Sequence, residues 1–439
     1  MNNQALRSPS ASTPSIPCPS GGGRRCGPSL PGITIFIMTL AIIWGAAGRT
    51  CLRADSPYIL AAGTKLYVRL EAGVSTKTSH LSQVVSARVV RDAMTPQGVL
   101  VPIGSEVTGK IVRVIPPLSS SDHARLLIRF SQLAIPHHPT FDLTAHLTEV
   151  ENAREKVLPD GTIQGVLEKD AAEGFVDGIF SKLGSPGNEM DKLSGKTLGK
   201  IDTSVTYPAG TDLILALDQP LSVDSPSPPT AATEISPALA AAVQNMLVGA
   251  PQRVQSKTKK PGDPLNLIVV GSSDQILSAF KQAGWDEARK LGTVTAVGTM
   301  RAMVSDNSYE KAPVSQLYLF GRPEDLAFEK ILNTFMKRHH LRLWRTLVPA
   351  PDGREIWLGA STHDIGMDVH LGVVSHAIDP NLDAERAKVG ADLEAGGLVA
   401  AERLVSRPNP LTEGKTATGG TWTTDGQMLV IELKTSAAM

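Results

Sequence analysis

The sequence TKLYVRL at residues 64–70 alternates polar and apolar side chains, which is the period of a β-strand with one buried face. The same period recurs at 84–90, 107–114 and 125–130, and glycine or proline residues separate these stretches. Short strands joined by glycine and proline turns are typical of a β-barrel or a β-sandwich. The sequence therefore predicts a mainly-β domain over residues 56–222.

The last strand expected in this domain resembles its first strand. The sequence AGTDLILAL at 209–217 repeats the pattern of AGTKLYVRL at 62–70. Between them, residues 166–183 carry apolar side chains at helical spacing together with several glycines. This part predicts a loose helix or a loop insertion.

Three short motifs of this domain carry a resemblance to a known class of proteins. They are AGT at 62–64, PIGSEVTG at 102–109 and AGT at 209–211. Together they resemble the β-barrel domain of conjugation and type IV secretion channel proteins, over most of residues 58–222. The resemblance implies a fold more than an activity, because these motifs form turns and strands.

Residues 223–263 are rich in proline, serine and lysine, a composition that is typical of a solvated linker. Within this stretch, residues 237–247 have the spacing of a short amphipathic helix. The sequence predicts a tether between the β domain and a second domain.

The second domain is predicted over residues 264–435 and is of the α+β class. LNLIVVG at 265–271 predicts a buried strand, and Ser272 is expected to cap a helix that ends at Gly284. Further expected elements are a strand at 314–321, a helix over 325–338, a hairpin joining 340–344 to 355–359, a helix from Asp379-Pro380 to about residue 395, and a hairpin over 421–433 that turns at Asp425-Gly426.

Four blocks of this domain occur in the order found in one protein family. They read LFGRPED at 319–325, RHHLRLWR at 338–345, DGREIWLG at 352–359 and HAIDPNLDAER at 376–386. These blocks resemble the LssY C-terminal domain family over about 264–434. The resemblance implies an association with the cell envelope and no established reaction.

The first 54 residues have the features of a signal peptide or a membrane anchor. Arg24-Arg25 precede an apolar run at 33–44, and small residues follow it to about residue 48. This order is typical of a bacterial export signal, and a retained inner-membrane anchor through 33–47 is the alternative. We therefore expect a periplasmic chain, or one that is anchored and faces the periplasm.

Composition excludes several classes of function. Lys+Arg and Asp+Glu are both 43 and aromatic residues make up 4% of the chain, so neither a basic field nor stacking platforms point to nucleic acid. The three cysteines, at positions 18, 26 and 51, all lie in the N-terminal segment. The remainder therefore has no disulfide, no thiolate metal site and no cysteine nucleophile.

Most of the residues suited to chemistry lie between positions 315 and 397. His363, Asp364, His376 and Asp379 are candidate ligands of a divalent metal ion, and His370 and Asp383 extend this set. In a strand over 340–345, alternate residues face opposite sides, so His340 and His339 are expected on different faces. The competing interpretation is structural, because aspartates suit the start of a helix and Arg386 can pair with Asp383.

Four arginines of the same region are candidate anion-binding residues, because a guanidinium group binds phosphate or carboxylate through two parallel hydrogen bonds. They are Arg322, Arg342, Arg345 and Arg354. No serine-hydrolase elbow, phosphate loop or dinucleotide fingerprint occurs in the sequence. No cofactor is therefore assigned from the sequence.

Two classes of function remain. The first is an exported envelope protein with a non-catalytic binding or scaffold role, in which the LssY-like domain contacts an envelope protein or an anionic small molecule. The alternative is a metal- or His/Asp-dependent hydrolase of an envelope phosphoester. The sequence leaves open whether the chain is an enzyme.

Overall fold

The computed structural model describes residues 58–119, 121–167, 202–227, 233–288, 316–334, 336–370, 373–417 and 419–435. The predicted signal or anchor segment and most of the predicted 166–183 insertion lie outside these residues. Within the described part of the chain, no helix is both long and apolar enough to cross a membrane. Residues Asp55–Met439 form one compact unit, in which we distinguish a barrel region (58–227) and a C-terminal region (233–435).

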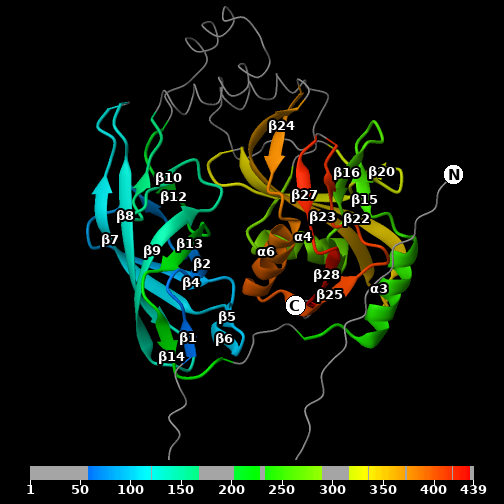
Figure 1. The fold of residues 1–439 in the computed structure, drawn as a ribbon, viewed down its shortest axis with the longest axis horizontal. Helices are drawn as coiled ribbons and strands as arrows, with labels where there is room; N and C mark the ends of the chain where they lie inside the picture. The colour runs from blue at the N-terminus through cyan, green and yellow to red at the C-terminus, as the bar shows by residue number, and fades with distance from the viewer. Residues whose placement is uncertain are drawn as a thin grey trace, which may run out of the picture. The chain divides into compact units, whose positions relative to one another are not determined.

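The barrel region is built on a closed sheet, as the sequence predicted (Figure 1). Six strands follow one another in the order β8, β7, β4, β2, β13, β9, and β9 pairs again with β8 to close the ring. Their bounds are β2 Lys65–Leu70, β4 Val84–Val89, β7 Glu106–Ile115, β8 Arg125–Ala134, β9 Thr140–Val150 and β13 Asp212–Leu217. The first and last long strands of the region, β2 and β13, are neighbours, with Leu66 opposite Leu215.

Alternation along the strands fills the barrel. In β2, Leu66, Val68 and Leu70 are buried, whereas the side chains between them are half-buried or exposed. They pack with inward residues of the other five strands into one apolar core. The shorter strands of the region are β1 Tyr58–Leu60, β3 Val74–Ser75, β5 Ala93–Thr95, β6 Gly98–Val101, β10 Lys156–Val157, β11 Ile163–Gln164, β12 Thr206–Tyr207 and β14 Leu221–Val223.

One glycine allows two barrel strands to approach closely. Gly109 of β7 lies at a register shift opposite β8. A Cβ atom added there would lie 2.2 Å from the carbonyl oxygen of Arg129 and 2.7 Å from the Cα atom of Phe130. Since both are backbone atoms, they cannot move aside by a rotamer change.

The C-terminal region contains a second large sheet. Its strand order is β18, β21, β22, β23, β17, β28, β25, and β24 pairs with β23 off this path. The bounds are β17 Leu267–Val270, β18 Asp286–Glu287, β21 Leu326–Lys330, β22 Lys337–Pro349, β23 Glu355–His370, β24 Val373–Ile378, β25 Val399–Ser406 and β28 Gln427–Leu433. Central strands β17 and β28 run parallel, with Leu267 opposite Leu429, although they come from the two ends of the region.

Helices cover both faces of this sheet. Helices α4 (Ser273–Gln282) and α6 (Leu382–Ala395) share one core with Leu341 and Leu343 of β22. Helix α3 (Pro237–Gly249) shares the other core with Trp344 of the same strand. The remaining strands are β15 Arg253–Gln255, β16 Pro261–Pro264, β19 Tyr318–Leu319, β20 Arg322–Pro323, β26 Glu413–Lys415 and β27 Thr421–Thr423. The α+β class expected for this region is therefore confirmed, as is the barrel before it.

Several local predictions were wrong. Residues 325–338 form β21 and the start of β22 instead of a helix, because Leu326 and Phe328 pair along β22 and enter the core under α4. The expected hairpin over 421–433 does not form: β27 pairs with β26, and β28 enters the central sheet. Helix α6 begins at Leu382, two residues later than expected, since the Asn381 side chain accepts a hydrogen bond from the Ala384 amide as its cap.

The stretch predicted as a solvated linker is folded over much of its length. Ser236 caps α3, whose Leu239, Val243 and Leu247 are buried together with Val254 of β15. The proline and lysine content masked this apolar spacing. Burial of these side chains attaches residues 237–264 to the C-terminal sheet.

Candidate functional site

Strand pairing sends the histidines and aspartates of the predicted site to opposite faces of one sheet. His339 of β22 lies opposite His363 of β23, and Arg338 lies opposite Asp364. Since side chains alternate along a strand, His339 and His363 share the face covered by α6, whereas Asp364 and His340 share the other face. The four candidate metal ligands therefore do not form one set.

On the face away from α6, Asp364 is the centre of a buried group. Its Oδ2 atom lies 2.6 Å from Nε2 of His340, 3.4 Å from Nε of Arg338 and 3.5 Å from Nδ1 of His376. Burial lowers the pKa of His340 to about 3, helped by the positive charge of Arg338. Asp379 lies outside this group. Its Oδ1 atom accepts a hydrogen bond from the Asn381 amide.

The four candidate anion-binding arginines all lie near carboxylates of the chain itself. Arg345 binds Glu355 at 2.9 Å, and Arg322 binds Asp325 and the carbonyl oxygen of Arg345. The other two candidates are Arg354, which binds Asp352 and Glu432, and Arg342, which lies 4.0 Å from Asp263. Of the four, Arg322 and Arg345 contact each other directly, through the hydrogen bond from Arg322 to the carbonyl oxygen of Arg345.

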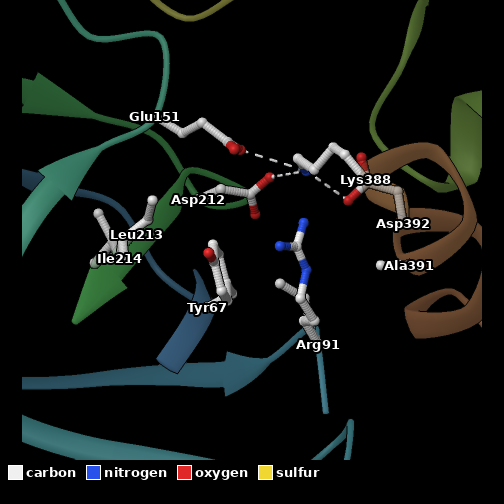
Figure 2. Close-up of a pocket in the computed structure, with 10 residues that line it drawn as sticks. Tyr67, Arg91, Glu151, Asp212, Leu213, Ile214, Lys388, Ala391 and Asp392 are labelled. Atoms are coloured by element: carbon white, nitrogen blue, oxygen red, sulfur yellow. Dashed lines mark hydrogen bonds and ion pairs between the residues drawn. The ribbon is translucent and has the colours of Figure 1, made fainter. Parts of the chain in front are cut away.

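A larger set of buried charges, absent from the sequence prediction, joins the barrel region to the C-terminal region. Lys388 of α6 places its Nζ atom 2.9 Å from Asp212 of β13, 2.7 Å from Asp392 and 3.4 Å from Glu151 (Figure 2). We call these four residues, together with Arg69 and Lys330, the Lys388 cluster. Its members come from β2, the end of β9, β13, β21 and α6.

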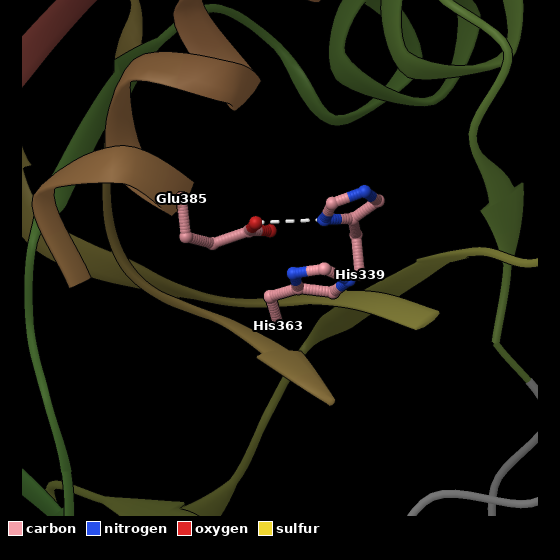
Figure 3. Close-up of side chains that lie close together, drawn as sticks. All are labelled: His339, His363 and Glu385. Carbon is pink, nitrogen blue, oxygen red and sulfur yellow. Dashed lines mark hydrogen bonds and ion pairs between the residues drawn. The ribbon is translucent and has the colours of Figure 1, made fainter. Parts of the chain in front are cut away.

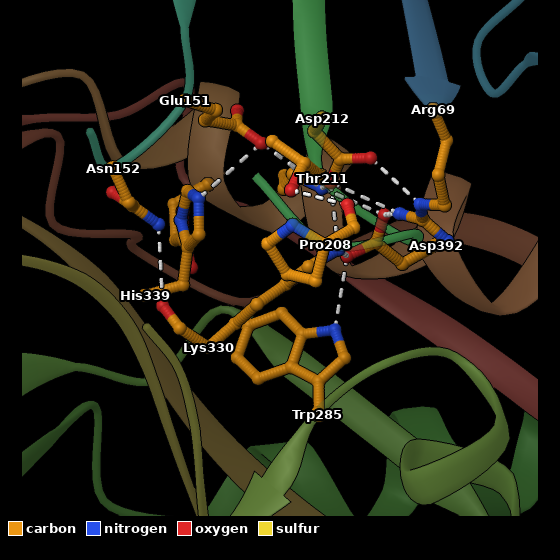
Figure 4. Close-up of polar contacts among 12 residues, drawn as sticks. Arg69, Glu151, Asn152, Pro208, Thr211, Asp212, Trp285, Lys330, His339 and Asp392 are labelled. Atoms are coloured by element: carbon orange, nitrogen blue, oxygen red, sulfur yellow. Dashed lines mark hydrogen bonds and ion pairs between the residues drawn. The ribbon is translucent and has the colours of Figure 1, made fainter. Parts of the chain in front are cut away.

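Every carboxylate of the cluster has at least one cationic partner. Arg69 bridges Asp212 at 2.6 Å and Asp392 at 2.7 Å (Figure 4). Lys330 lies 2.7 Å from Asp212 and 3.2 Å from Asp392. The indole nitrogen of Trp285 donates to Oδ2 of Asp392 at 2.9 Å, the oxygen that Lys330 also approaches. Strand β13 of the barrel is thereby tied to helix α6.

Most pKa values in the cluster move in the direction that favours the charged form, whereas burial lowers the pKa of Lys330. Burial acts to raise the pKa of Asp212, but the positive charges of Lys388 and Lys330 hold it well below its usual range. Burial acts to lower the pKa of Lys388, yet Asp212 and Asp392 raise it well above its usual range. The cluster is therefore a set of charges that stabilise one another away from water.

The cavity beside the Lys388 cluster is small. A cavity of about 10 Å³ is lined by Asp212, Lys388 and Asp392, and by Arg91 stacked 4.0 Å over the ring of Tyr67. This volume holds no more than about one water molecule. Among the described residues, the cluster thus offers a phosphoester no room to bind.

Next to the cluster lies a second group, formed by His339, His363 and Glu385 (Figure 3). The two imidazole rings are stacked with their centroids 4.2 Å apart. Nδ1 of His339 lies 2.7 Å from Oε2 of Glu385. One potential ligand atom from each of the three residues lies within 4.8 Å of the others. Among the described residues, these three side chains form a group that could hold a metal ion.

The two histidines have opposite pKa shifts. Burial acts to lower the pKa of His339, but the carboxylates of Glu385 and Glu151 raise it to about 9. For His363, burial and the neighbouring charge on His339 lower the pKa to about 4. At neutral pH, His339 is therefore protonated in this arrangement and His363 is neutral.

Part of the C-terminal region matches a known protein family. Residues 247–428 match the LssY C-terminus family. The resemblance expected from the four sequence blocks is thereby confirmed. A search of solved structures returned ComB10 of the Com type IV secretion system of Helicobacter pylori, at 16% identity and a TM-score of 0.22, covering 38% of this chain and 92% of that chain. At this TM-score the likeness carries no argument, and no curated protein matches the chain.

The sequence alone did not reveal the residues that join the C-terminal region to the barrel region. Because of its family match, we call the C-terminal region (233–435) the LssY-like region from here on. His339 and Glu385 lie in two of the family-like blocks, 338–345 and 376–386, but no local sequence feature shows that they meet. Asp212 did leave a signal, since it replaces Lys65 in the repeated AGT pattern and begins an otherwise apolar strand. Lys388 and Asp392 left a weaker signal as an i,i+4 pair.

Three acidic side chains near the far end of α6 give a pH dependence. Burial, with the charges of Glu402 and Asp92, raises the pKa of Glu394 to about 7. The folded protein thus keeps a proton that the unfolded chain releases above about pH 4.5, so stability is lost as pH rises to about 7. We expect Glu394→Gln to raise the free energy of unfolding at pH 8 by about 1 kcal/mol, since solvent screens this half-buried group.

Urea denaturation at pH 8 and pH 5 tests this expectation. The gain in the free energy of unfolding should be smaller at pH 5. Glu413→Gln, in the exposed part of β26, is the control and should change neither midpoint. Equal gains for Glu394→Gln at both pH values would contradict it.

Proposed function

We propose that this chain is an exported bacterial envelope protein with a non-catalytic binding or scaffold role, in which the LssY-like region contacts a partner. The observation that carries this proposal is the pairing of buried ionisable groups with one another across the two regions. Asp212, Lys388 and Asp392 hold a strand of the barrel against a helix of the LssY-like region. These side chains bind one another, so they hold the two regions together and are not available to a reacting substrate.

Two further features favour this function over the hydrolase alternative. The candidate metal ligands His363 and Asp364 face opposite sides of the sheet. The cavity beside Lys388 holds about one water molecule. A phosphoester hydrolase needs converging groups and room for its substrate at the same place.

A contact surface is offered by the turn between β19 and β20 and by the end of the β22–β23 hairpin. Leu347 is fully exposed and Phe320 is 51% exposed. The two segments are neighbours, because Arg322 donates a hydrogen bond to the carbonyl oxygen of Arg345. Exposed apolar side chains on two neighbouring turns suit a protein partner with an apolar contact surface. The apolar run at 33–47 would place this surface in the periplasm as an export signal or anchor.

The experiment combines a hydrolysis assay with a binding assay on the full chain. With added zinc or manganese, we expect turnover of bis-p-nitrophenyl phosphate and of phosphatidic acid vesicles to stay at the level of His363→Ala. Partners recovered by affinity purification from solubilised envelopes should be lost for Leu347→Asp. The control Leu118→Asp, at an 89% exposed site of the barrel, should retain them.

Turnover that disappears in His363→Ala while the circular dichroism spectrum is unchanged would establish the hydrolase instead. Equal recovery of partners by Leu347→Asp and Leu118→Asp would remove the proposed contact surface.

A further inference from the structure

The His339, His363 and Glu385 side chains point donor atoms at a common position. Figure 3 shows one ring nitrogen of His363 directed toward the carboxylate of Glu385, which also accepts from His339. The histidines come from paired positions on β22 and β23, and Glu385 comes from the first turns of α6. A pair of strands and a helix therefore hold the three side chains in place, which favours a defined ligand geometry.

The tautomer of His363 leaves the correct nitrogen available to a metal. Its Nε2 atom lies 2.9 Å from Oδ1 of Asn152. The amide of Asn152 is oriented by its Nδ2 group, which donates to the carbonyl oxygen of Lys330 at 3.2 Å. Oδ1 must then accept, so His363 carries its proton on Nε2. The lone pair is on Nδ1, which faces Glu385.

His339 has a more distant outer contact. Its Nε2 atom lies 3.7 Å from a carboxylate oxygen of Glu151, while Nδ1 faces Glu385. A histidine that binds a metal through one nitrogen commonly directs its other N–H at a carboxylate or carbonyl group. Both outer partners, Glu151 and Asn152, follow β9 in the barrel region.

Burial at this group leaves a polar atom without a hydrogen bond. In the described part of the chain, Oε1 of Glu385 is buried and has no hydrogen-bond partner. A buried carboxylate oxygen without a partner is costly, and a cation at the shared position would satisfy it.

We propose that His339, His363 and Glu385 form a binding site for a zinc-type divalent metal ion, with the Nδ1 atoms of both imidazoles and the Glu385 carboxylate as ligands. Two histidines and one glutamate are a known zinc donor set that leaves a fourth position for water. The ion would take the place of the proton between His339 and Glu385. These two ligand atoms would separate from 2.7 Å to about 3.3 Å, the spacing of neighbouring ligands in a tetrahedral zinc site.

Charge is compatible with this exchange. The group and the Lys388 cluster together hold three cations, Arg69, Lys330 and Lys388, and four carboxylates, Glu151, Asp212, Glu385 and Asp392. The carboxylates outnumber these cations by one, so the surroundings are compatible with a positive ion. The site is new relative to the predicted ligands, since it keeps His363 and replaces Asp364, His376 and Asp379. It goes beyond the proposed function and does not depend on it.

Because the outer partners belong to the barrel and the ligands belong to the LssY-like region, the ion would bind tightly only where both regions are in contact. The full chain is therefore the correct material. We would measure zinc content by elemental mass spectrometry after preparation without chelator, and zinc affinity by competition with a chromophoric chelator. Cobalt(II) substitution would report a tetrahedral site through its visible absorption.

We expect about one zinc per chain, lost in His363→Gln and Glu385→Gln. Asn152→Ala, which removes an outer partner and no ligand, should weaken zinc about 10- to 100-fold. His146→Ala removes a histidine that pairs with Asp218 on the barrel surface and should bind zinc normally. If His363→Gln does not fold, the wild-type cobalt spectrum and Asn152→Ala decide the question.

Three results would overturn the site: no stoichiometric zinc after reconstitution, unchanged affinity in His363→Gln and Asn152→Ala, or an equal loss in His146→Ala.

Discussion

Lys388→Met is expected to lower the free energy of unfolding by about 3–5 kcal/mol, because it leaves buried carboxylates short of a cation. Asp212 and Asp392 would keep Arg69 and Lys330, whereas Glu151 would lose its 3.4 Å lysine contact. Methionine fills nearly the same volume, so the loss reports charge more than packing.

The measurement exploits the positions of the tryptophans. The sequence has five tryptophans, at 44, 285, 344, 357 and 422, so residues 58–227 contain none. Four of the five tryptophans lie in the LssY-like region, so in a chain that carries Trp44→Phe tryptophan fluorescence follows that region, and far-UV circular dichroism follows both regions. We expect the two urea transitions to coincide in that chain and to separate when Lys388→Met is added.

Lys77→Met is the matched control, because Lys77 pairs with Asp202 where both side chains are more than half exposed. It should cost at most about 1 kcal/mol and leave the transitions together. A loss of less than about 1 kcal/mol in Lys388→Met itself would show that the cluster does not hold the two regions together.

Gly109→Ala should damage the barrel severely, by about 3 kcal/mol or more. The added methyl group would meet the backbone of Arg129 and Phe130 at 2.2–2.8 Å, so β7 and β8 would have to separate. The far-UV circular dichroism transition should move to lower urea, and less of the protein should be recovered in soluble form.

Gly366→Ala is the control for this substitution. Gly366 also lies in a strand, but an added Cβ atom there would meet nothing within 4 Å. It should shift the midpoint little. A Gly109→Ala protein as stable as Gly366→Ala would mean that β7 and β8 are less closely packed than described.

The barrel was predictable because its information is local. Alternation in residues 64–70 places Leu66, Val68 and Leu70 on one face whatever the rest of the chain does. The repeat at 209–217 identified the strand that pairs with it. The hairpin between β22 and β23 was predictable for the same reason, since a turn sequence lies between two alternating strands.

Elements decided by distant partners were not predictable in this way. The sequence predicts residues 326–330 as part of a helix, yet they form a strand because β22 and β18 lie on either side and pair with them. Helix α6 buries Glu385, Lys388 and Asp392 in addition to its apolar Val389 and Leu393. Charged side chains of this kind are expected at the surface unless a partner is known.

The candidate site depended on register, which sequence patterns fix poorly. The split between His363 and Asp364 follows from alternation alone and was accessible in advance. The meeting of His339 with His363 requires the pairing of β22 and β23 residue by residue. The contribution of Glu151 and Asn152 requires the contact between the two regions, for which no local sequence signal exists.

Two pairs of neighbouring strands limit the order in which the chain can fold. They are β2 with β13 in the barrel and β17 with β28 in the C-terminal region. Each pair unites the beginning of a region with its end, as Leu267 beside Leu429 shows. Neither sheet can be completed while a ribosome or a translocation channel still holds the last strand. A premature stop before residue 427 would remove β28 from its place between β17 and β25, leaving an unpaired edge on β17 open to aggregation during biogenesis.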